Sequence, residues 1–302
     1  MSKKEFKKQV AWKLLSEQPG ETMRRPNEDV SVEYTLDSCY YEGKFKGCNM
    51  LVPVTIGGKT ERIMIDNGCA QYCVANETFV KSHGLRALDA DVAIKGSAGA
   101  STSSRFAIAD SLMIGRLTFY NVLFVVLPDE ATKNPVKSFD AIIGANIYRL
   151  VGEMYFDNRS RTITFPYVQK DADPNLTINW VGHHYASVKI GSDTLTMMFD
   201  MGAATTVLSS LYYERYKDDV EKSGLKDTVR TVGIGGTKYE VGYKMPELKV
   251  QACGGEFTAH KVSVQTSSRG FAEEDFGLLG LDFLLSFERA VLNIQKMYLQ
   301  VY

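Results

Sequence analysis

Two aspartates in this sequence follow short apolar runs, and each is followed by one further residue and a glycine. Asp66-Asn67-Gly68 comes after Ile63-Met64-Ile65, and Asp200-Met201-Gly202 comes after Met197-Met198-Phe199. Asp-x-Gly alone is common turn chemistry, because Asp caps its own backbone and glycine accepts a positive φ. Two such aspartates brought together would form a carboxylate pair that can accept and donate protons. Asp66 and Asp200 are therefore candidate catalytic residues.

The surroundings of the two tripeptides also repeat in order. Each copy is followed by small residues, an apolar pair, a helix-like segment, a glycine-rich turn and an apolar-apolar-Gly element. The spacing from Asp66 to Gly144 is 78 residues, and the spacing from Asp200 to Gly280 is 80. A repeat of this length indicates a duplicated domain and is too long for a solenoid. A third copy, Asp275-Phe276-Gly277, has no comparable sequence after it and is interpreted as chance.

The composition is that of an ordinary globular protein. The chain has 302 residues, of which 44% are hydrophobic and 24% charged, and its net charge is −1. This charge does not favour a nucleic acid as partner, and no apolar run reaches the roughly 20 residues that span a bilayer. The basic N-terminus lacks the apolar run of a secretory signal. We expect a cytoplasmic protein, or a periplasmic or secreted one if an export signal has been removed.

The cysteines and histidines show no metal-binding spacing. Cys69 and Cys73 occupy the repeat positions of Ala203 and Val207, so we interpret both as small buried apolar residues. A Cys39–Cys48 disulfide is an alternative for an exported protein. The four histidines have no motif around them, and we expect ordinary surface or core residues: His83, His183, His184 and His260. We expect neither a metal nor a cofactor.

Short strand-like segments separated by turn signals predict an all-β fold with a few short helices. Gly57-Gly58 predicts a hairpin turn before Asp66, and helix-like segments cover residues 3–16, 76–84 and 211–223. We divide the chain into an N-terminal extension of helix, linker and strand (1–48), an N-terminal lobe (49–170) and a C-terminal lobe (171–302). Whether the extension covers the cleft, adds a strand at the lobe interface or serves as a tether stays open.

Over residues 50–302 the chain resembles the pepsin/retropepsin superfamily of aspartic proteases, in its bacterial retropepsin-like, single-chain two-lobe form. The family motif is apolar-apolar-Asp-Thr/Ser-Gly-Ala/Ser/Thr, followed later by apolar-apolar-Gly. The resemblance implies a bilobal, pepsin-like double-β-barrel architecture that arose by internal duplication. It also implies that Asp66 and Asp200 are the catalytic pair and that Gly68 and Gly202 allow tight loops. The apolar-apolar-Gly elements would pack beneath these loops.

The resemblance further implies how such a protein would act. The two aspartates would activate a water molecule that hydrolyses a peptide or protein substrate, without a metal or cofactor. The protein would be a monomer whose two lobes form an intramolecular pseudo-dimer.

Two glycine-rich stretches are candidate flaps over the substrate: Gly96-Ser97-Ala98-Gly99 and Gly233-Ile234-Gly235-Gly236. The second resembles the flaps of retroviral proteases. Small residues suit a mobile hairpin tip whose backbone hydrogen-bonds an extended peptide. Neither stretch has the spacing of a phosphate-binding P-loop.

The chain departs from the family motif directly after each aspartate, where family members have Thr or Ser hydroxyls that bind backbone across the lobe interface. Asn67 can donate and accept hydrogen bonds, whereas the Met201 side chain cannot replace a hydroxyl. We predict an active endopeptidase with a mildly acidic to neutral pH optimum. The alternative is a pseudoprotease that binds extended peptides in the same cleft. A glycosidase ranks below both, because glycosidases give their two acids different environments.

Overall fold

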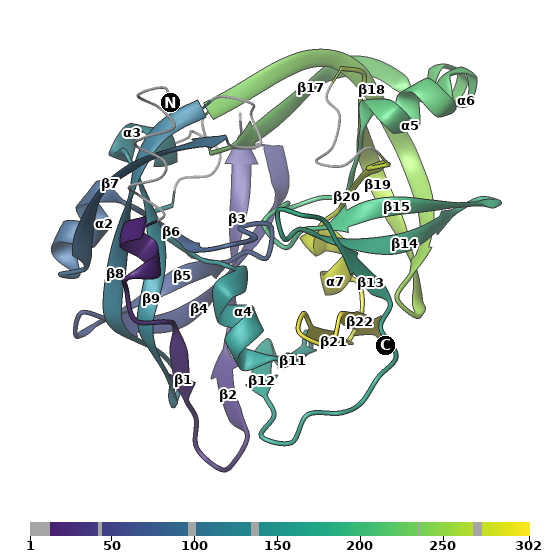
Figure 1. Cartoon of the computed structure of the whole chain (residues 1–302). Helices are drawn as coiled ribbons and strands as arrows, with labels where there is room; N and C mark the ends of the chain where they lie inside the picture. Colours follow the sequence, from purple (N-terminus) through teal and green to yellow (C-terminus); the bar gives the residue numbers. More distant parts are fainter. Residues whose placement is uncertain (1–12, 42–43, 96–100, 134–138, 235, 268–273) are drawn as a thin grey trace.

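The computed structural model describes residues 13–41, 44–95, 101–133, 139–234, 236–267 and 274–302. Strands predominate in these ranges and form three sheets. Figure 1 shows most of the first half of the chain in one lobe and most of the second half in the other, with one sheet below both. The predicted mostly β, two-lobed fold is therefore confirmed.

In the sheet of the first lobe, one strand ends directly before the first candidate aspartate. Its strand order is β1-β9-β6-β10-β5-β4-β8-β7, and β3 pairs with β4. The predicted hairpin joins β4 to β5, and its turn residues Gly57 and Gly58 have φ values of 56° and 76°, which favour glycine. β5 ends at Ile65, directly before Asp66. The strands are β1 (Thr22–Arg24), β3 (Thr35–Tyr41), β4 (Lys44–Ile56), β5 (Lys59–Ile65), β6 (Cys73–Asn76), β7 (Arg86–Lys95), β8 (Ser101–Ile114), β9 (Leu117–Leu127) and β10 (Ala141–Ile143).

The sheet of the second lobe places the second aspartate in the same way. Its strand order is β13-β14-β15-β20-β16-β19-β18-β17. A tight turn at residues 191–192 joins β14 to β15, and β15 ends at Phe199, directly before Asp200. The strands are β13 (Leu176–Ile178), β14 (His184–Ile190), β15 (Asp193–Phe199), β16 (Val207–Leu208), β17 (Leu225–Gly233), β18 (Gly236–Ala252), β19 (Gly255–Gln265) and β20 (Gly277–Leu279).

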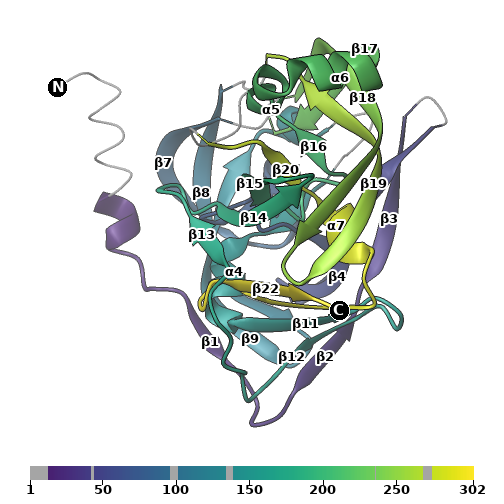
Figure 2. The ribbon, with the colours of Figure 1, turned by 90° about the vertical axis from the view of Figure 1, so that its right-hand side faces the viewer.

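A third sheet joins the two lobes through backbone hydrogen bonds. Its order is β2-β12-β11-β21-β22, and β11 pairs antiparallel with β21 from the other half of the chain. Figure 2 shows these strands stacked on the lower side of the molecule. The outer strand β2 comes from the N-terminal extension, so part of the extension belongs to the shared sheet. The strands are β2 (Val30–Glu33), β11 (Glu153–Asp157), β12 (Thr162–Phe165), β21 (Arg289–Asn293) and β22 (Tyr298–Val301).

The helices are short, and one predicted helix is wrong in its length. The segment 211–223 forms two helices, because the backbone at Tyr216 (φ −120°, ψ 34°) interrupts the helix and its hydroxyl donates to Asp193. The predicted helix after Asn76 is confirmed, with the Asn76 side chain accepting from Phe79 N–H as an N-cap. Residues 13–16 are helical, and the rest of predicted helix 3–16 lies outside the described residues. The helices are α2 (Glu77–Ser82), α3 (Asp129–Thr132), α4 (Ala145–Val151), α5 (Ser210–Arg215), α6 (Lys217–Ser223) and α7 (Leu281–Leu285).

Two groups of buried apolar side chains fill the molecule. The larger core extends through both lobes and the shared sheet, and includes Ile63 and Ile65 of β5. Met64 points to the opposite face, because successive strand residues alternate, and belongs to a smaller group that we call the first-lobe cluster. Its members are Met64, Val74, Leu88, Phe106, Ile108, Val125, Leu127 and Ile142.

Two further findings concern the cysteines and the length of the helices. Cys48 is a free thiol, so the alternative of a Cys39–Cys48 disulfide does not hold. Among the described residues, no helix is long and apolar enough to cross a membrane.

Candidate active site

The two Asp-x-Gly loops are held by the same backbone arrangement in each lobe. β10 lies parallel to β5, and Ile143 accepts a hydrogen bond from the Asp66 N–H at 3.0 Å. β20 lies parallel to β15, and Leu279 accepts from the Asp200 N–H, also at 3.0 Å. The apolar-apolar-Gly elements therefore lie beside the aspartates in space, about 80 residues along the chain from them.

Glycine is required in both loops because each carboxylate lies against the opposite loop. The N–H of Gly68 donates to Asp66 Oδ1 at 2.7 Å, and the N–H of Gly202 donates to Asp200 Oδ1 at 2.8 Å. A Cβ added to Gly68 would collide with the Asp200 carboxylate, and one added to Gly202 would collide with that of Asp66. The predicted pair is thus brought together at the contact between the lobes, with Asp66 only 8% exposed.

Asn67 joins the two loops through its side-chain amide. Its Nδ2 donates to the Phe199 carbonyl at 2.7 Å, and its Oδ1 accepts from the Met201 N–H at 2.7 Å. One buried amide therefore bonds the backbone on both sides of Asp200. The Met201 side chain is 1% exposed and packs in the large core, so it contributes apolar contacts there while its backbone N–H makes the polar contact.

Cys69 departs from its interpretation as a buried apolar residue. It is only partly buried, and its thiol lies 3.6 Å from Asp66 Oδ2, to which it donates. Cys73 is buried as predicted, but its sulfur is also a hydrogen-bond partner of Gly144 N–H and Asn146. Burial raises the pKa of the Cys73 thiol to about 12, so this residue stays protonated.

The glycine of each apolar-apolar-Gly element lies where the backbone passes close to an active-site loop. A Cβ on Gly144 would lie 2.7 Å from the carbonyl carbon of Tyr72, and one on Gly280 would lie 2.6 Å from that of Thr205. The residue after each glycine forms a backbone hydrogen bond with the active-site loop. The Ala145 N–H donates to the Cys69 carbonyl, and the Leu281 N–H donates to the Ala203 carbonyl. This arrangement matches the expected packing beneath the loops.

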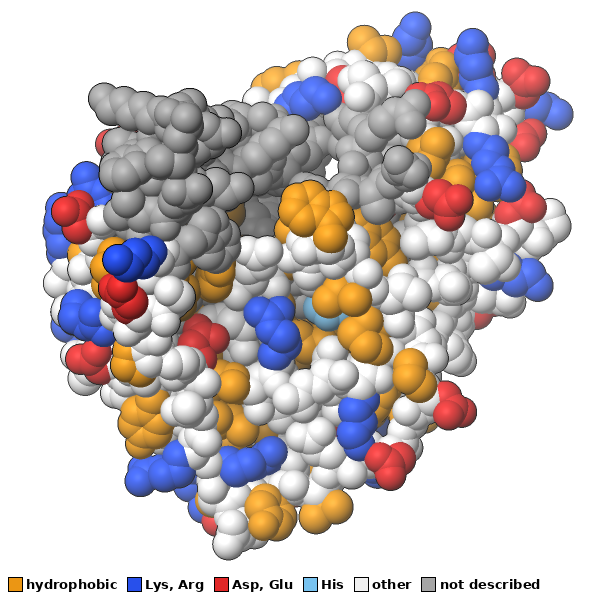
Figure 3. Space-filling view, viewed as in Figure 1, with side chains coloured by type: hydrophobic (Ala, Val, Ile, Leu, Met, Phe, Trp, Pro, Cys, Tyr) orange, Lys and Arg blue, Asp and Glu red, His pale blue; other side chains and the backbone are white. Residues whose placement is uncertain are grey.

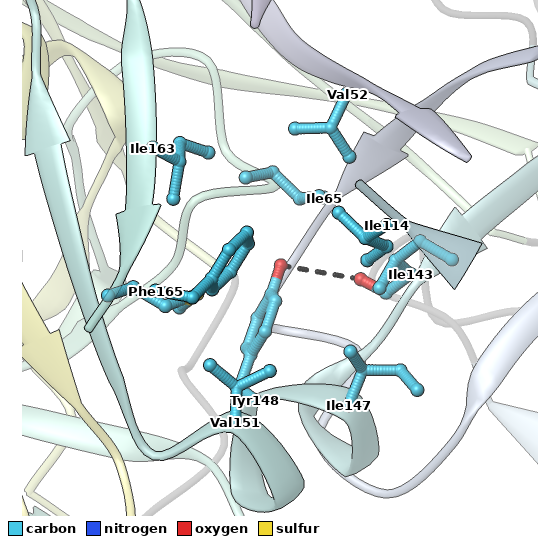
Figure 4. A pocket seen from close by; sticks show the side chains of 10 residues that line it. Val52, Ile65, Ile114, Ile143, Ile147, Tyr148, Val151, Ile163 and Phe165 are labelled. Carbon is cyan, nitrogen blue, oxygen red and sulfur yellow. Dashed lines mark hydrogen bonds between the residues drawn. The ribbon is translucent and has the colours of Figure 1, made fainter. Parts of the chain in front are cut away.

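The protein below Asp66 is apolar and closely packed. Figure 4 shows the Tyr148 hydroxyl directed at the Ile143 carbonyl, to which it donates at 3.4 Å. Burial raises the pKa of Tyr148 well above its ordinary value, and the nearby Asp66 carboxylate raises it further. The adjacent cavity has a volume of about 10 Å³ and apolar walls, so it offers no room for a ligand.

The second candidate flap extends from the second lobe to the first. Gly233 ends β17 and Gly236 begins β18, and the half-buried Ile234 between them packs against the first-lobe cluster. Figure 1 shows this hairpin arching across the top of the molecule from one lobe to the other. Gly235 and the first candidate flap, Gly96-Ser97-Ala98-Gly99, lie outside the described residues.

Sequence reasoning missed one residue at the site, His183. It is 7% exposed, lies near the Asp66 carboxylate and forms a hydrogen bond with the Gly68 backbone. His183 is thus a core residue, as one of the two expected environments allows, but it lies beside the active-site loop. The only signal in the sequence was its place in a turn rich in Asn and Gly, Asn179-Trp180-Val181-Gly182, just before the β14–β15 hairpin. His260 is exposed as expected, and His83 and His184 are buried.

Among the described residues, no group of three or more His, Cys, Asp or Glu side chains could hold a metal ion.

Figure 3 shows hydrophobic side chains on the surface where the two lobes meet. Among the exposed hydrophobic residues are Ile178 and Trp180, which belong to β13 and the turn that follows it.

Known structures resemble most of the chain. The aspartic proteinase from Irpex lacteus superposes with a TM-score of 0.53 at 13% identity, covering 90% of this chain and 96% of that one. The chain has the pepsin-like aspartic protease fold. Two seed proteins share it: conglutin gamma, a basic 7S globulin from lupine (TM-score 0.51, 10% identity, 90% and 94% covered), and basic 7S globulin from soybean (0.50, 11%, 93% and 94%).

At the sequence level the match is shorter. The family model of the aspartyl proteases matches residues 52–147, which contain Asp66 and its loop. No curated protein sequence matches the chain. Structural similarity at 10–13% sequence identity establishes the aspartic protease fold alone.

Proposed function

We propose that this protein is an aspartic endopeptidase whose catalytic residues are Asp66 and Asp200. The observation that carries the proposal is the close approach of each carboxylate to the glycine of the opposite loop. Two carboxylates this close cannot both ionise at low cost, so the active pair shares one proton, as in aspartic proteases generally. Its titration belongs to the pair and not to either residue.

The pair supplies both an acid and a base for peptide hydrolysis. The ionised carboxylate takes a proton from a water molecule as the water oxygen attacks the scissile carbonyl carbon. The protonated carboxyl donates its proton to the carbonyl oxygen. The carboxyl that took the water proton then passes it to the amide nitrogen, and the C–N bond of the tetrahedral intermediate breaks as one of its hydroxyls returns a proton to the other carboxylate. This leaves a new carboxylic acid, a new amine and the pair with its single proton.

The β17–β18 hairpin supports an extended peptide as the substrate. Strand edges bind extended chains through main-chain hydrogen bonds, and this hairpin extends from the second lobe to the first-lobe cluster. Closure over a bound peptide would exclude bulk water from the cleft and strengthen the electrostatic interactions of the pair and its one attacking water.

Cleavage of a mixed peptide library between pH 3 and pH 8 tests the proposal, with and without pepstatin. Wild type is expected to cut, with its maximum at mildly acidic to neutral pH. Asp66→Asn and Asp200→Asn should each lose at least about 10³-fold in rate, because each removes one half of the acid–base pair. Cuts that persist in both variants would contradict the proposed catalytic pair, and a rate that still rises down to pH 3 would contradict the expected pH optimum.

One observation favours a second candidate, a peptide-binding pseudoprotease. The residues after the aspartates are Asn67 and Met201, so the site lacks the two hydroxyls of the family motif. Library peptides that bind wild type and both Asn variants equally, without being cut at any pH, would support this alternative.

A further inference from the structure

The turn before β14 is a compact structure built around one side chain. Asn179 Oδ1 accepts the N–H groups of Val181, Gly182 and His183, each at 3.0 Å. The Asn179 N–H in turn donates to the His183 carbonyl at 3.1 Å. These contacts fix residues 179–183 and also fix the amide orientation, because only the oxygen can accept three N–H groups.

This turn is packed against the active-site loop of the other lobe. Gln71 Nε2 donates to the Val181 carbonyl at 3.1 Å, and a Cβ on Gly182 would lie 3.2 Å from the Ala70 carbonyl oxygen. Gly182 has φ +107°, so glycine suits both the backbone and the close approach. The turn therefore brings His183 to the loop that carries Asp66.

Hydrogen-bond roles determine the tautomer of His183. Asn179 Nδ2 lies 3.4 Å from His183 Nδ1. Because Nδ2 can only donate, Nδ1 must accept, and the proton of the neutral ring is on Nε2. The N–H of Gly68 is already donated to Asp66 Oδ1. The backbone group of Gly68 that bonds the ring is therefore its carbonyl, which accepts from Nε2–H.

The same amide connects His183 to the third Asp-x-Gly. Asn179 Nδ2 also donates to the Tyr185 hydroxyl at 3.3 Å, and that hydroxyl donates to Asp275 Oδ2 at 3.4 Å. Asp275 is 1% exposed, so its interpretation as a chance motif misses a structural role. A chain of buried and partly buried polar groups thus extends from Asp275 to Gly68.

We propose that His183 is a positioning residue for the dyad, the pair formed by Asp66 and Asp200; this inference rests on the proposed function. His183 holds the Gly68 carbonyl through a hydrogen bond and tunes the protonation of Asp66. As a neutral ring it fixes the Asp66 loop against the second lobe. As a cation it favours the ionised form of Asp66 and so keeps the dyad active at lower pH. No other residue of the turn has a titratable side chain.

The charged and titratable groups around the ring come from four parts of the chain. Asp66 of the first-lobe loop favours the imidazolium, while burial opposes it more strongly, so the pKa of His183 lies below its ordinary value. His184 follows it on β14, with Arg149 of α4 close to His184. Asp275 is linked to the ring through Tyr185 and Asn179.

The first test needs no substrate and uses nitrogen NMR of the imidazole rings in the full chain. The His183 signal is assigned as the one missing in His183→Gln. We expect a neutral ring protonated at Nε2 whose pKa falls further in Asp66→Asn, because that change removes the anion that favours the cation. A proton on Nδ1, or an unchanged pKa in Asp66→Asn, would overturn the proposal.

The second test is kinetic. His183→Leu should lower kcat about tenfold with little change in KM, because the loop loses its support in the transition state. His183→Gln, which keeps a donor, should stay within about threefold at neutral pH but move the acid limb of kcat/KM upward by about half a pH unit. His260→Gln, at an exposed histidine far from the turn, should match wild type.

The two tests separate this proposal from the proposed function. If wild type cuts no peptide but the NMR result is as expected, the endopeptidase assignment fails and the His183–Asp66 coupling stands. If wild type cuts and the His183 variants share its kcat and its acid limb, the endopeptidase assignment stands and the role of His183 is wrong.

Discussion

At the scale of single residues, one amide performs the bridging that the family motif assigns to two hydroxyls. Asn67 is 1% exposed and bonds the backbone at Phe199 and at Met201. An Asn side chain has a donor and an acceptor on one planar group, so it can satisfy both groups from one loop. Met201 is then free to be apolar, and it packs in the core.

Replacing Asn67 with Leu tests this bridging. The change preserves approximate volume but leaves the Phe199 carbonyl and the Met201 N–H without partners, at about 1–3 kcal/mol for each buried group. We expect the free energy of unfolding to fall by several times as much as in Met201→Leu, which conserves volume and should cost less than about 1.5 kcal/mol. Urea unfolding measures both, and equal losses would contradict the bridging role.

Burial of His184 makes stability depend on pH. Burial, with smaller contributions from Arg149 and His183, lowers the pKa of His184 to about 4, while the unfolded chain titrates near 6.5. Between these values the unfolded state binds more protons, so the free energy of unfolding falls as pH drops from 6.5 towards 4. Full protonation of this one group would cost about 3 kcal/mol.

Urea unfolding at pH 7 and pH 4.5 measures this loss. His184→Leu should lose less stability between the two pH values than wild type, and His260→Gln should lose the same amount as wild type. Identical pH dependence in His184→Leu and wild type would mean that His184 is not the group responsible.

At the scale of elements, the sequence correctly predicted the features that depend on neighbouring residues. The Gly57-Gly58 turn, the Asn76 cap and the strands that end at the aspartates are all visible in the sequence, because turns, caps and apolar runs depend on neighbouring residues. The break at Tyr216 coincides with a hydrogen bond from its hydroxyl to Asp193, which is distant in sequence. The contact of His183 with the Gly68 loop depends on packing between lobes, which a single sequence does not display.

The β17–β18 hairpin allows a matched pair of substitutions. Ile234→Asp places a charge against the first-lobe cluster, where burial without a partner is unfavourable. We expect kcat/KM to fall about tenfold or more through a weakened closed state. Val241→Asp on the same hairpin, at a position 59% exposed, should stay within about twofold. A comparable loss in both variants would show that the tip contact has no special role.

At the scale of the whole molecule, the shared sheet connects the lobes and includes part of the N-terminal extension. Val30, Val32 and Tyr34 are buried in the large core, and β2 pairs with β12. Of the three roles left open from sequence, an added strand at the lobe interface agrees with residues 30–33. Sequence alone could not decide this, because a four-residue strand has too little pattern to reveal its partner.

Truncation tests the structural role of the extension. A chain that starts at Gly20 keeps β1, β2 and β3 and should unfold cooperatively. A chain that starts at Asn49 loses three buried side chains worth about 1.5–3 kcal/mol each, a large part of an ordinary domain's 5–15 kcal/mol. We expect no cooperative transition for it in thermal unfolding followed by circular dichroism. Equal midpoints for the two chains would contradict this account.

The central claim is that Asp66 and Asp200 form one coupled acid–base pair across the lobe contact. The most direct measurement is a carboxyl carbon NMR titration of both aspartates in wild type, Asp66→Asn and Asp200→Asn. We predict two separated macroscopic steps in wild type, and in each variant a single step for the remaining carboxyl at a pKa that differs from both. Two carboxyls that titrate independently in wild type, each unchanged when the other is replaced, would contradict the account.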